Sequence, residues 1–217
     1  ASWYNYKNAS VRPNFTTPRD YYTDWIKAGK PGWNPVTNLV TLANGQVYGG
    51  GEQSEDNQMP VEESGNMLIM LGALAKVEGN ADFSKPYLPQ LERWAEYLAQ
   101  HGLDPANQLC TDDFAGHLAR NANLSAKTCV ALGAYAQILG AADQDEQTMK
   151  CRATAEEFAA KWLRLSEGPQ VSVLVFGSKS QDSWSQKYNL VWDRVLGLDL
   201  FPAEVFDREM SWYRAHV

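Results

Sequence analysis

Residues 110 to 139 read CTDDFAGHLARNANLSAKTCVALGAYAQIL, and they indicate the fold of this chain. The second half of the segment is small and apolar on every face, so we expect a helix from about Leu118 to Leu139 that lies inside the fold. Asp112 and Asp113 stand just before it, where a polar loop meets a buried helix. A carboxylate in such a place is costly unless a partner or a ligand meets it. The segment therefore predicts a buried helix and a site at its entrance.

A second acidic pair stands at the start of a second apolar helix. The stretch from Asn57 to Leu71 reads NQMPVEESGNMLIML and places Glu62 and Glu63 in the first turn. We expect this helix from about Pro60 to Val77, because proline suits the first helical position and Gly79 suits the stop. Its apolar residues cover every face, so it is also predicted to be buried. Two acidic pairs at two helix entrances predict one shared site.

Amphipathic helices alternate with these apolar ones. The remaining helices are expected at Pro86 to Gln100, Asp143 to Leu165, Trp184 to Leu196 and Pro202 to Tyr213. The helix expected at Asp143 to Leu165 begins with Asp143 and Glu146 at capping-box spacing. Helices one, three and five are expected to line a common axis, with two, four and six outside them, as in a toroid of helical hairpins. The simpler alternative is an ordinary helical bundle.

The count of helices limits the architecture. A six-hairpin toroid needs about twelve helices, and this chain offers about six. The predicted fold class is therefore all-α, an (α/α)6 toroid of which about half, three hairpins, is present. We assign residues 58–217 to this helical-hairpin domain and residues 1–57 to an irregular N-terminal arm, with at most a short helix around Asp20 to Lys27. The run from Val171 to Phe176 is the one clear strand candidate.

Composition excludes several classes of function. The formal net charge is −7, and the 19 Lys and Arg residues are spread singly along the sequence. Both features argue against nucleic-acid binding. We find no segment that could span a bilayer and no signal peptide at the start of the chain. The three cysteines show no CxxC and no zinc spacing, so we expect buried thiols. No metal and no cofactor is predicted.

Three strings resemble the glutaminase A family of fungi and bacteria. They are NGQVYGGGEQSEDNQMPVEESGNMLIML at 44–71, CTDDFAGHLARNANLSAKTCVALGAYA at 110–136 and SWSQKYNLVWDRVLGLDLFP at 183–202. The likeness spans roughly residues 43–214, whereas residues 1–42 and 170–182 depart from the family's pattern. It implies a six-hairpin (α/α)6 domain, normally the C-terminal part of a larger secreted protein, and hydrolysis of L-glutamine to L-glutamate and ammonia. It also implies an extracellular or periplasmic location.

Amide hydrolysis needs an attacking group, stabilisation of the oxyanion and a proton for the departing ammonia. The chain has no GxSxG and no SxxK motif, and of its three histidines His117 alone is near the acidic motifs. A water activated by carboxylates remains, and the candidate catalytic residues are Glu62, Glu63, Asp112 and Asp113. The plainer interpretation is that the glutamates complement the helix dipole and the aspartates cap a helix or a turn.

Candidate substrate-binding residues follow the second acidic pair. Arg120 is a candidate for binding the α-carboxylate of an amino-acid substrate through a bidentate ion pair, and Asn121 follows it in the sequence. His117 is a candidate donor to a carboxylate or to substrate, although a histidine near a helix start is more often structural. Lys187 and Tyr188 are weaker candidates of the same kind.

Two other functions remain open from the sequence. Helical toroids often hold paired carboxylates and aromatic walls for sugars, so a glycoside hydrolase is the alternative enzyme. The chain is also compatible with an inactive structural half-domain. In that case the apolar faces of the first and fifth helices would be exposed, and they would contact the remainder of the same polypeptide or a second copy. The expected partner of an active chain is a small-molecule substrate, with no nucleic acid and no membrane.

Overall fold

The computed structural model describes residues 59–106, 108, 110, 118–177 and 183–216, together with the backbone of three short strands between residues 32 and 48. The chain divides into two compact units, Ala1–Pro60 and Val61–Val217. The second unit carries the described part of the candidate site.

The first unit contains a small antiparallel sheet. Its strands are β1 (Gly32–Asn34), β2 (Leu39–Thr41) and β3 (Val47–Tyr48), in the order β1-β2-β3. The register pairs Gly32 with Thr41 and Val40 with Tyr48. The sequence led us to expect loops here, because strands of two or three residues are too short to show an alternating pattern. The short helix expected around 20–27 lies outside the described residues.

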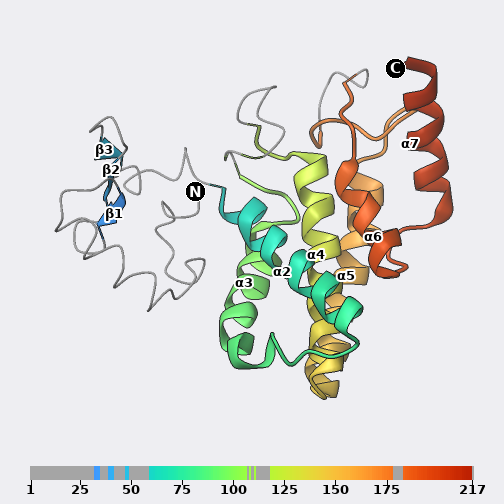
Figure 1. Ribbon diagram of the computed structural model, residues 1–217. Helices are drawn as coiled ribbons and strands as arrows, with labels where there is room; N and C mark the ends of the chain where they lie inside the picture. The colour runs from blue at the N-terminus through green and yellow to red at the C-terminus, as the bar shows by residue number, and fades with distance from the viewer. Residues whose placement is uncertain are drawn as a thin grey trace. The chain divides into compact units, whose positions relative to one another are not determined.

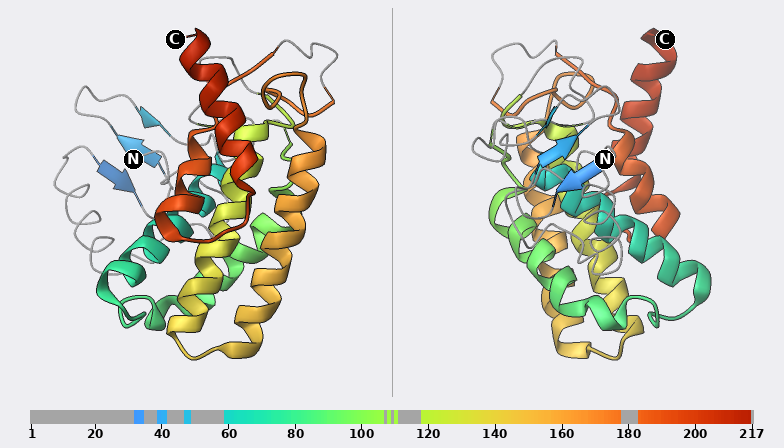
Figure 2. Two further views of the ribbon diagram at one scale, coloured as in Figure 1. Left: turned by 90° about the vertical axis from the view of Figure 1, so that its right-hand side faces the viewer. Right: turned by 60° about the vertical axis from the view of Figure 1, so that its left-hand side comes forward.

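The second unit is built from three helical hairpins. Its helices are α2 (Pro60–Glu78), α3 (Leu88–His101), α4 (Ala122–Ala141), α5 (Asp145–Leu165), α6 (Val191–Leu196) and α7 (Ala203–His216), with 3-10 turns η4 (Lys85–Tyr87) and η6 (Tyr188–Leu190). In Figure 1, α2, α4 and α6 run downwards and α3, α5 and α7 run upwards, so successive helices are antiparallel. Figure 2 shows the long pair α4 and α5 side by side in both views. The predicted all-α hairpin class is confirmed for this unit.

Helix α4 is the centre of the core. Nearly all of its side chains are buried, from Ala122 to Leu139, as its uniformly apolar sequence predicted. The amphipathic α5 lies against it with Ala155, Phe158 and Trp162 buried. The indole of Trp162 donates to the Ala122 carbonyl oxygen at 2.7 Å, which fixes the upper part of α5 on the start of α4. The sequence correctly separated an inside helix from an outside helix in this hairpin.

Glycines let α2 approach α4 closely. A Cβ atom on Gly72 would lie 2.8 Å from the Cβ and 3.3 Å from the Cα of Ala134, and one on Gly65 would lie 2.8 Å from the Cγ of Lys127. These distances are shorter than ordinary van der Waals contact, so larger residues at either position would push the two helices apart. The small residues therefore set the separation of the first two inner helices.

The prediction that α2 is buried on all sides is wrong. Met70 is 54% exposed and Val77 is 86% exposed, on the side of α2 that does not face α4. On α6, Val191 and Val195 are each about half exposed. The physical reason is that, among the described residues, no helix covers these sides of the two outermost inner helices. Exposed apolar residues on the first and fifth helices are what a half-toroid predicts.

Two helix starts differ from the sequence prediction. Helix α4 begins at Ala122 rather than near Leu118, because the side chain of Asn121 caps it by accepting from the Leu124 amide at 2.9 Å. The capping box expected at Asp143 and Glu146 is absent. Asp143 instead adopts a left-handed conformation with φ of 61°, and α5 starts at Asp145 without a side-chain cap.

The segment 171–190 also differs from expectation. The predicted strand at 171–176 forms only isolated bridges, between Val173 and Trp184 and between Asn121 and Val175. The helix expected from Trp184 starts only at Tyr188. Its expected first turn is held in a non-helical path, because the Lys187 amide donates to the Tyr213 hydroxyl at 2.8 Å. Contacts with α7 therefore override the local helical pattern.

Candidate functional site at the N-terminal ends of the inner helices

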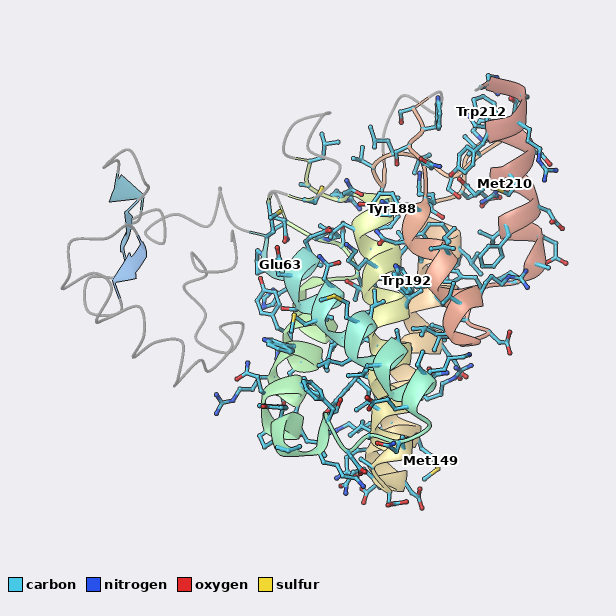
Figure 3. All side chains as sticks on the ribbon, viewed as in Figure 1. Glu63, Met149, Tyr188, Trp192, Met210 and Trp212 are labelled. Carbon is cyan, nitrogen blue, oxygen red and sulfur yellow. The ribbon has the colours of Figure 1, made fainter. Side chains whose placement is uncertain are left out.

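The three inner helices begin at the same end of the second unit, the upper end in Figure 1. Figure 3 shows Glu63 near the start of α2 and Tyr188 near the start of η6 at this end, with Met149 of α5 at the other. Helix N-termini present unpaired amide groups and partial positive charge. This end of the unit is therefore suited to carboxylates and to anionic groups of a ligand.

A buried ion pair joins α2 to α4 at this end. The ammonium of Lys127 donates to Oε1 of Glu62, and the two side chains are only 4% and 3% exposed. The same ammonium donates to Oδ1 of Asn66 at 2.8 Å. The absent side chain at Gly65 leaves room for the lysine stem. Because both side chains are almost fully buried, the attraction between the two charges offsets part of the cost of removing them from water.

The third inner element completes this cluster. The Lys127 ammonium lies 6.0 Å from the centre of the Tyr188 ring, at the outer limit of a cation–π contact. Asn189 fixes η6 on α4 by donating from its side chain to the Asn123 carbonyl oxygen at 3.0 Å. Two of the predicted site residues, Glu62 and Tyr188, are thus brought to the same lysine, from helices far apart in the sequence.

Lys127 was not among the site residues predicted from the sequence. A signal was nevertheless present, because Lys127 is the one charged residue within an otherwise apolar and uncharged helix, ANLSAKTCVALGAYAQILGA. A lysine on a helix that is buried all round requires a counter-charge. This reasoning indicates Glu62 or Glu63, on the other apolar helix, as the partner, and the structure shows that it is Glu62.

Two other predicted residues, Arg120 and Asn121, have structural roles where the chain enters α4. Arg120 pairs with Asp104 through a 3.1 Å contact in which both side chains are about half exposed. Its backbone has a left-handed φ of 64° and links the loop at Pro105 to Phe176. Asn121 caps α4, and its side-chain amide donates to the Cys110 sulfur at 3.7 Å. Arg120 and Asn121 thus shape the loop that leads into α4.

Lys187 is buried, and its ammonium is held by oxygen atoms of the loop before η6. Its ammonium donates to the carbonyl oxygens of Ser172 and Ser185, at 3.2 and 2.9 Å, and to the Ser185 hydroxyl at 3.1 Å. These bonds hold the loop before η6, so a substrate carboxylate would have to compete with them. Glu63 is half-buried in the first turn of α2. Asp112, Asp113 and His117 lie outside the described residues.

The thiols of Cys129 and Cys151 are unsuited to nucleophilic chemistry. Burial raises the pKa of Cys151 to about 12, and it raises the pKa of Cys129 further. Both sulfurs therefore stay protonated near neutral pH, and a thiol in that state is a weak nucleophile. No cluster of three or more metal-ligating side chains occurs in the described ranges. None of the helices described is both long and apolar enough to cross a membrane.

The fold and the site define a half-toroid of helical hairpins, with a buried ion pair where its inner helices begin. The chain belongs to the glutaminase A family, since the family model described as the glutaminase A six helical-hairpin domain matches residues 41–217. It is 34% identical over 168 residues to glutaminase A of Aspergillus oryzae (strain ATCC 42149 / RIB 40). It is 28% identical over 104 residues to a protein of Arthroderma benhamiae named "Probable glutaminase".

The coverage of these relatives is uneven. The matched region is 76% of this chain and 24% of the Aspergillus protein, and 48% of this chain and 12% of the Arthroderma protein. The chain therefore spans about a quarter of the length of the first relative. Family membership is shown by these matches, whereas the activity of a whole glutaminase does not transfer with them.

Proposed function

We propose that this chain contributes to a glutaminase-like hydrolase, which cleaves the carboxamide C–N bond of L-glutamine to give L-glutamate and ammonia. The observation that supports the proposal is the family match over residues 41–217, together with 34% identity to a protein named glutaminase A. The buried Glu62–Lys127 pair adds a physical argument, because charged groups are rarely placed inside an inner helix layer without a function or a compensating partner.

In the proposed reaction, a carboxylate takes a proton from a water molecule that attacks the amide carbon. The candidates for this base are Glu62, Glu63, Asp112 and Asp113. As the C–N bond breaks, a carboxylic acid returns the proton to the leaving ammonia. We assign Lys127 a positioning role. Its ammonium orients Glu62 by donating a hydrogen bond to the carboxylate.

The test is ammonia release from L-glutamine by the purified chain. The test variants are Glu63→Gln, Asp112→Asn and Asp113→Asn. The control variant is Glu78→Gln, because Glu78 is an exposed residue at the other end of α2. Loss of a general acid or base lowers the rate by roughly 10²–10⁴-fold. The control should retain the parent rate.

Parallel assays on aryl glycosides address the alternative enzyme. Hydrolysis of glycosides without ammonia release from glutamine would replace the amidohydrolase by a glycoside hydrolase. Absence of both activities in a folded chain would favour the structural half-domain.

A further inference from the structure

The buried ammonium of Lys127 fixes the side chain of Asn66 in one orientation. Its Nζ donates to Oδ1 of Asn66 at 2.8 Å, and an ammonium group has donors only. The amide therefore turns its oxygen towards Lys127, and Nδ2, with its two N–H donors, is directed away from the lysine. Asn66 is half-buried, whereas the Lys127 side chain is 4% exposed, so the amide is the more accessible of the two groups.

Lys127 has one more N–H group than it has acceptors among the described residues. An ammonium carries three N–H groups, and two oxygen atoms accept from Lys127, one on Glu62 and one on Asn66. Both acceptors belong to α2, so the third N–H points away from that helix. The Tyr188 ring, whose centre is 6.0 Å from Nζ, is too distant to replace an oxygen acceptor. A ligand oxygen that accepts from this buried donor gains an interaction that the described residues do not supply.

The charges around these donors favour a neutral oxygen over a carboxylate. The charge of Lys127 is already balanced by Glu62, and Glu63 adds another carboxylate in the same turn of α2. A ligand carboxylate would therefore meet like charge here. The carbonyl oxygen of a carboxamide is neutral when it binds and becomes negative only as the reaction proceeds. Donors that meet this oxygen stabilise the transition state more than the bound substrate.

From this arrangement we propose that Nδ2 of Asn66 and the third N–H of Lys127 form the oxyanion hole for the carboxamide of the substrate. This inference rests on the proposed function and adds to it the groups that stabilise the tetrahedral intermediate. Glu63 and Asn66 are three residues apart on α2, and side chains at this spacing are neighbours, with roughly 5–6 Å between their Cβ atoms. A water activated by Glu63 and the two donors can therefore act on one carboxamide group.

The reaction at this site has two steps. In the first, the water oxygen bonds to the amide carbon, a water proton passes to the carboxylate base, and the C=O π electrons move to the oxygen, which accepts from Asn66 and Lys127. In the second, this electron pair re-forms the C=O bond while the C–N bond breaks. The C–N electron pair stays on the nitrogen, which takes the proton from the carboxylic acid and leaves as ammonia. The new side-chain carboxyl of glutamate gives its proton to solvent, and neither Asn66 nor Lys127 gains or loses one.

The main test variant is Asn66→Asp. Aspartate has the same shape and still accepts from Lys127, but it has an oxygen in place of the Nδ2 donor. We expect kcat for ammonia release from L-glutamine to fall roughly 10²–10³-fold, with KM within about threefold of the parent value, because an oxyanion donor acts on the transition state. Asn66→Leu removes the same donor without adding a charge, and its kcat should fall to a similar extent.

The matched control is Asn80→Asp. It makes the same change of side chain and of charge beyond the other end of α2, where Oδ1 of Asn80 accepts from the Asp82 amide at 2.9 Å. Aspartate keeps this acceptor, so the control should retain the parent kcat and KM. An equal loss of kcat in Asn80→Asp and Asn66→Asp would show only a general effect of charge and would refute the assignment.

Calorimetric titration with L-methionine sulfone tests the donors without turnover. The sulfur of this compound is tetrahedral and carries two oxygen atoms at the position of the carboxamide carbon of glutamine. We expect the parent chain to bind it more tightly than L-norleucine, which lacks these oxygens. Asn66→Asp should weaken sulfone binding about tenfold, the equivalent of one hydrogen bond, and should leave norleucine binding unchanged.

The two assays separate this inference from the proposed function. Equal kcat in the parent and Asn66→Asp, or equal sulfone affinity in the two, would overturn the oxyanion hole, whereas ammonia release by the parent would still support the glutaminase proposal. A folded parent that releases no ammonia but loses sulfone affinity in Asn66→Asp would keep the donor pair and reject the activity of the chain. A folded parent that neither releases ammonia nor binds the sulfone would reject both.

Discussion

Removing one member of the Glu62–Lys127 pair should destabilise the chain far more than removing both. Lys127→Met keeps the stem beside Gly65 but removes the ammonium that donates to the Glu62 carboxylate, whose side chain is 3% exposed. Loss of one partner of a buried pair costs about 3–5 kcal/mol, whereas replacing both partners by neutral groups of similar shape is often close to neutral. We therefore expect Lys127→Met to lower the free energy of unfolding by about 3 kcal/mol or more, and Lys127→Met with Glu62→Gln to recover about 2 kcal/mol of it.

The assay is urea unfolding of the parent, both single variants and the double variant at pH 7. The matched control is the exposed Lys85–Asp82 pair at 3.1 Å, where coupling should be about 0.5 kcal/mol or less. Strict additivity of the two single changes at Glu62 and Lys127 would refute the reasoning.

Three further predictions concern stability and association. Gly72→Ala should lower the free energy of unfolding by about 1–3 kcal/mol, because the added methyl group overlaps Ala134. Gly140→Ala, whose added methyl group would have its nearest neighbour at 3.6 Å, should raise the free energy of unfolding by about 0.5–1 kcal/mol. Denaturant unfolding that ranks the two variants in the opposite order would contradict this packing. Burial raises the pKa of Asp193, so the native state holds the proton more tightly than the unfolded chain, and the stability of the parent falls as pH rises from about 4 through the native pKa. Asp193→Asn should therefore gain stability relative to the parent over that interval, and a difference that is flat with pH in urea titrations would exclude it. Light scattering of the purified chain at serial dilution should show association that Val77→Lys with Val191→Lys reduces, since both valines are exposed; a monomer at every concentration would show that these side chains carry no interface.

The sequence predicted the helical elements well where the apolar pattern was extreme. Helix α4 is apolar on every face and is buried on every face, and α3 and α5 have one apolar stripe each and bury that stripe. Periodicity predicts such elements because the burial of apolar side chains supplies most of the free energy that stabilises them. The same reasoning failed for α2, because a pattern reports which faces can be buried and not which neighbours are present to bury them.

Boundaries and turns were predicted less well, because they depend on single hydrogen bonds. Asn121 ends the loop before α4 through one bond to the Leu124 amide, and Asp143 takes a left-handed conformation that no capping box allows. The path of 184–187 is set by Tyr213 of α7, 26 residues beyond Lys187 in the sequence. A pattern within one segment carries no information about a partner on another.

In the candidate site, charged residues on apolar helices were the most informative feature of the sequence. The sequence singled out Glu62 and Glu63 for their place at an apolar helix start, and the structure shows why the buried Glu62 carboxylate is tolerated there: Lys127 of α4 pairs with it. The lysine was overlooked because it was judged by the apolar helix around it, although a buried charge on one inner helix requires an opposite charge on a neighbouring one. If that requirement is applied first, Glu62 and Lys127 predict the contact between α2 and α4 without knowledge of the fold.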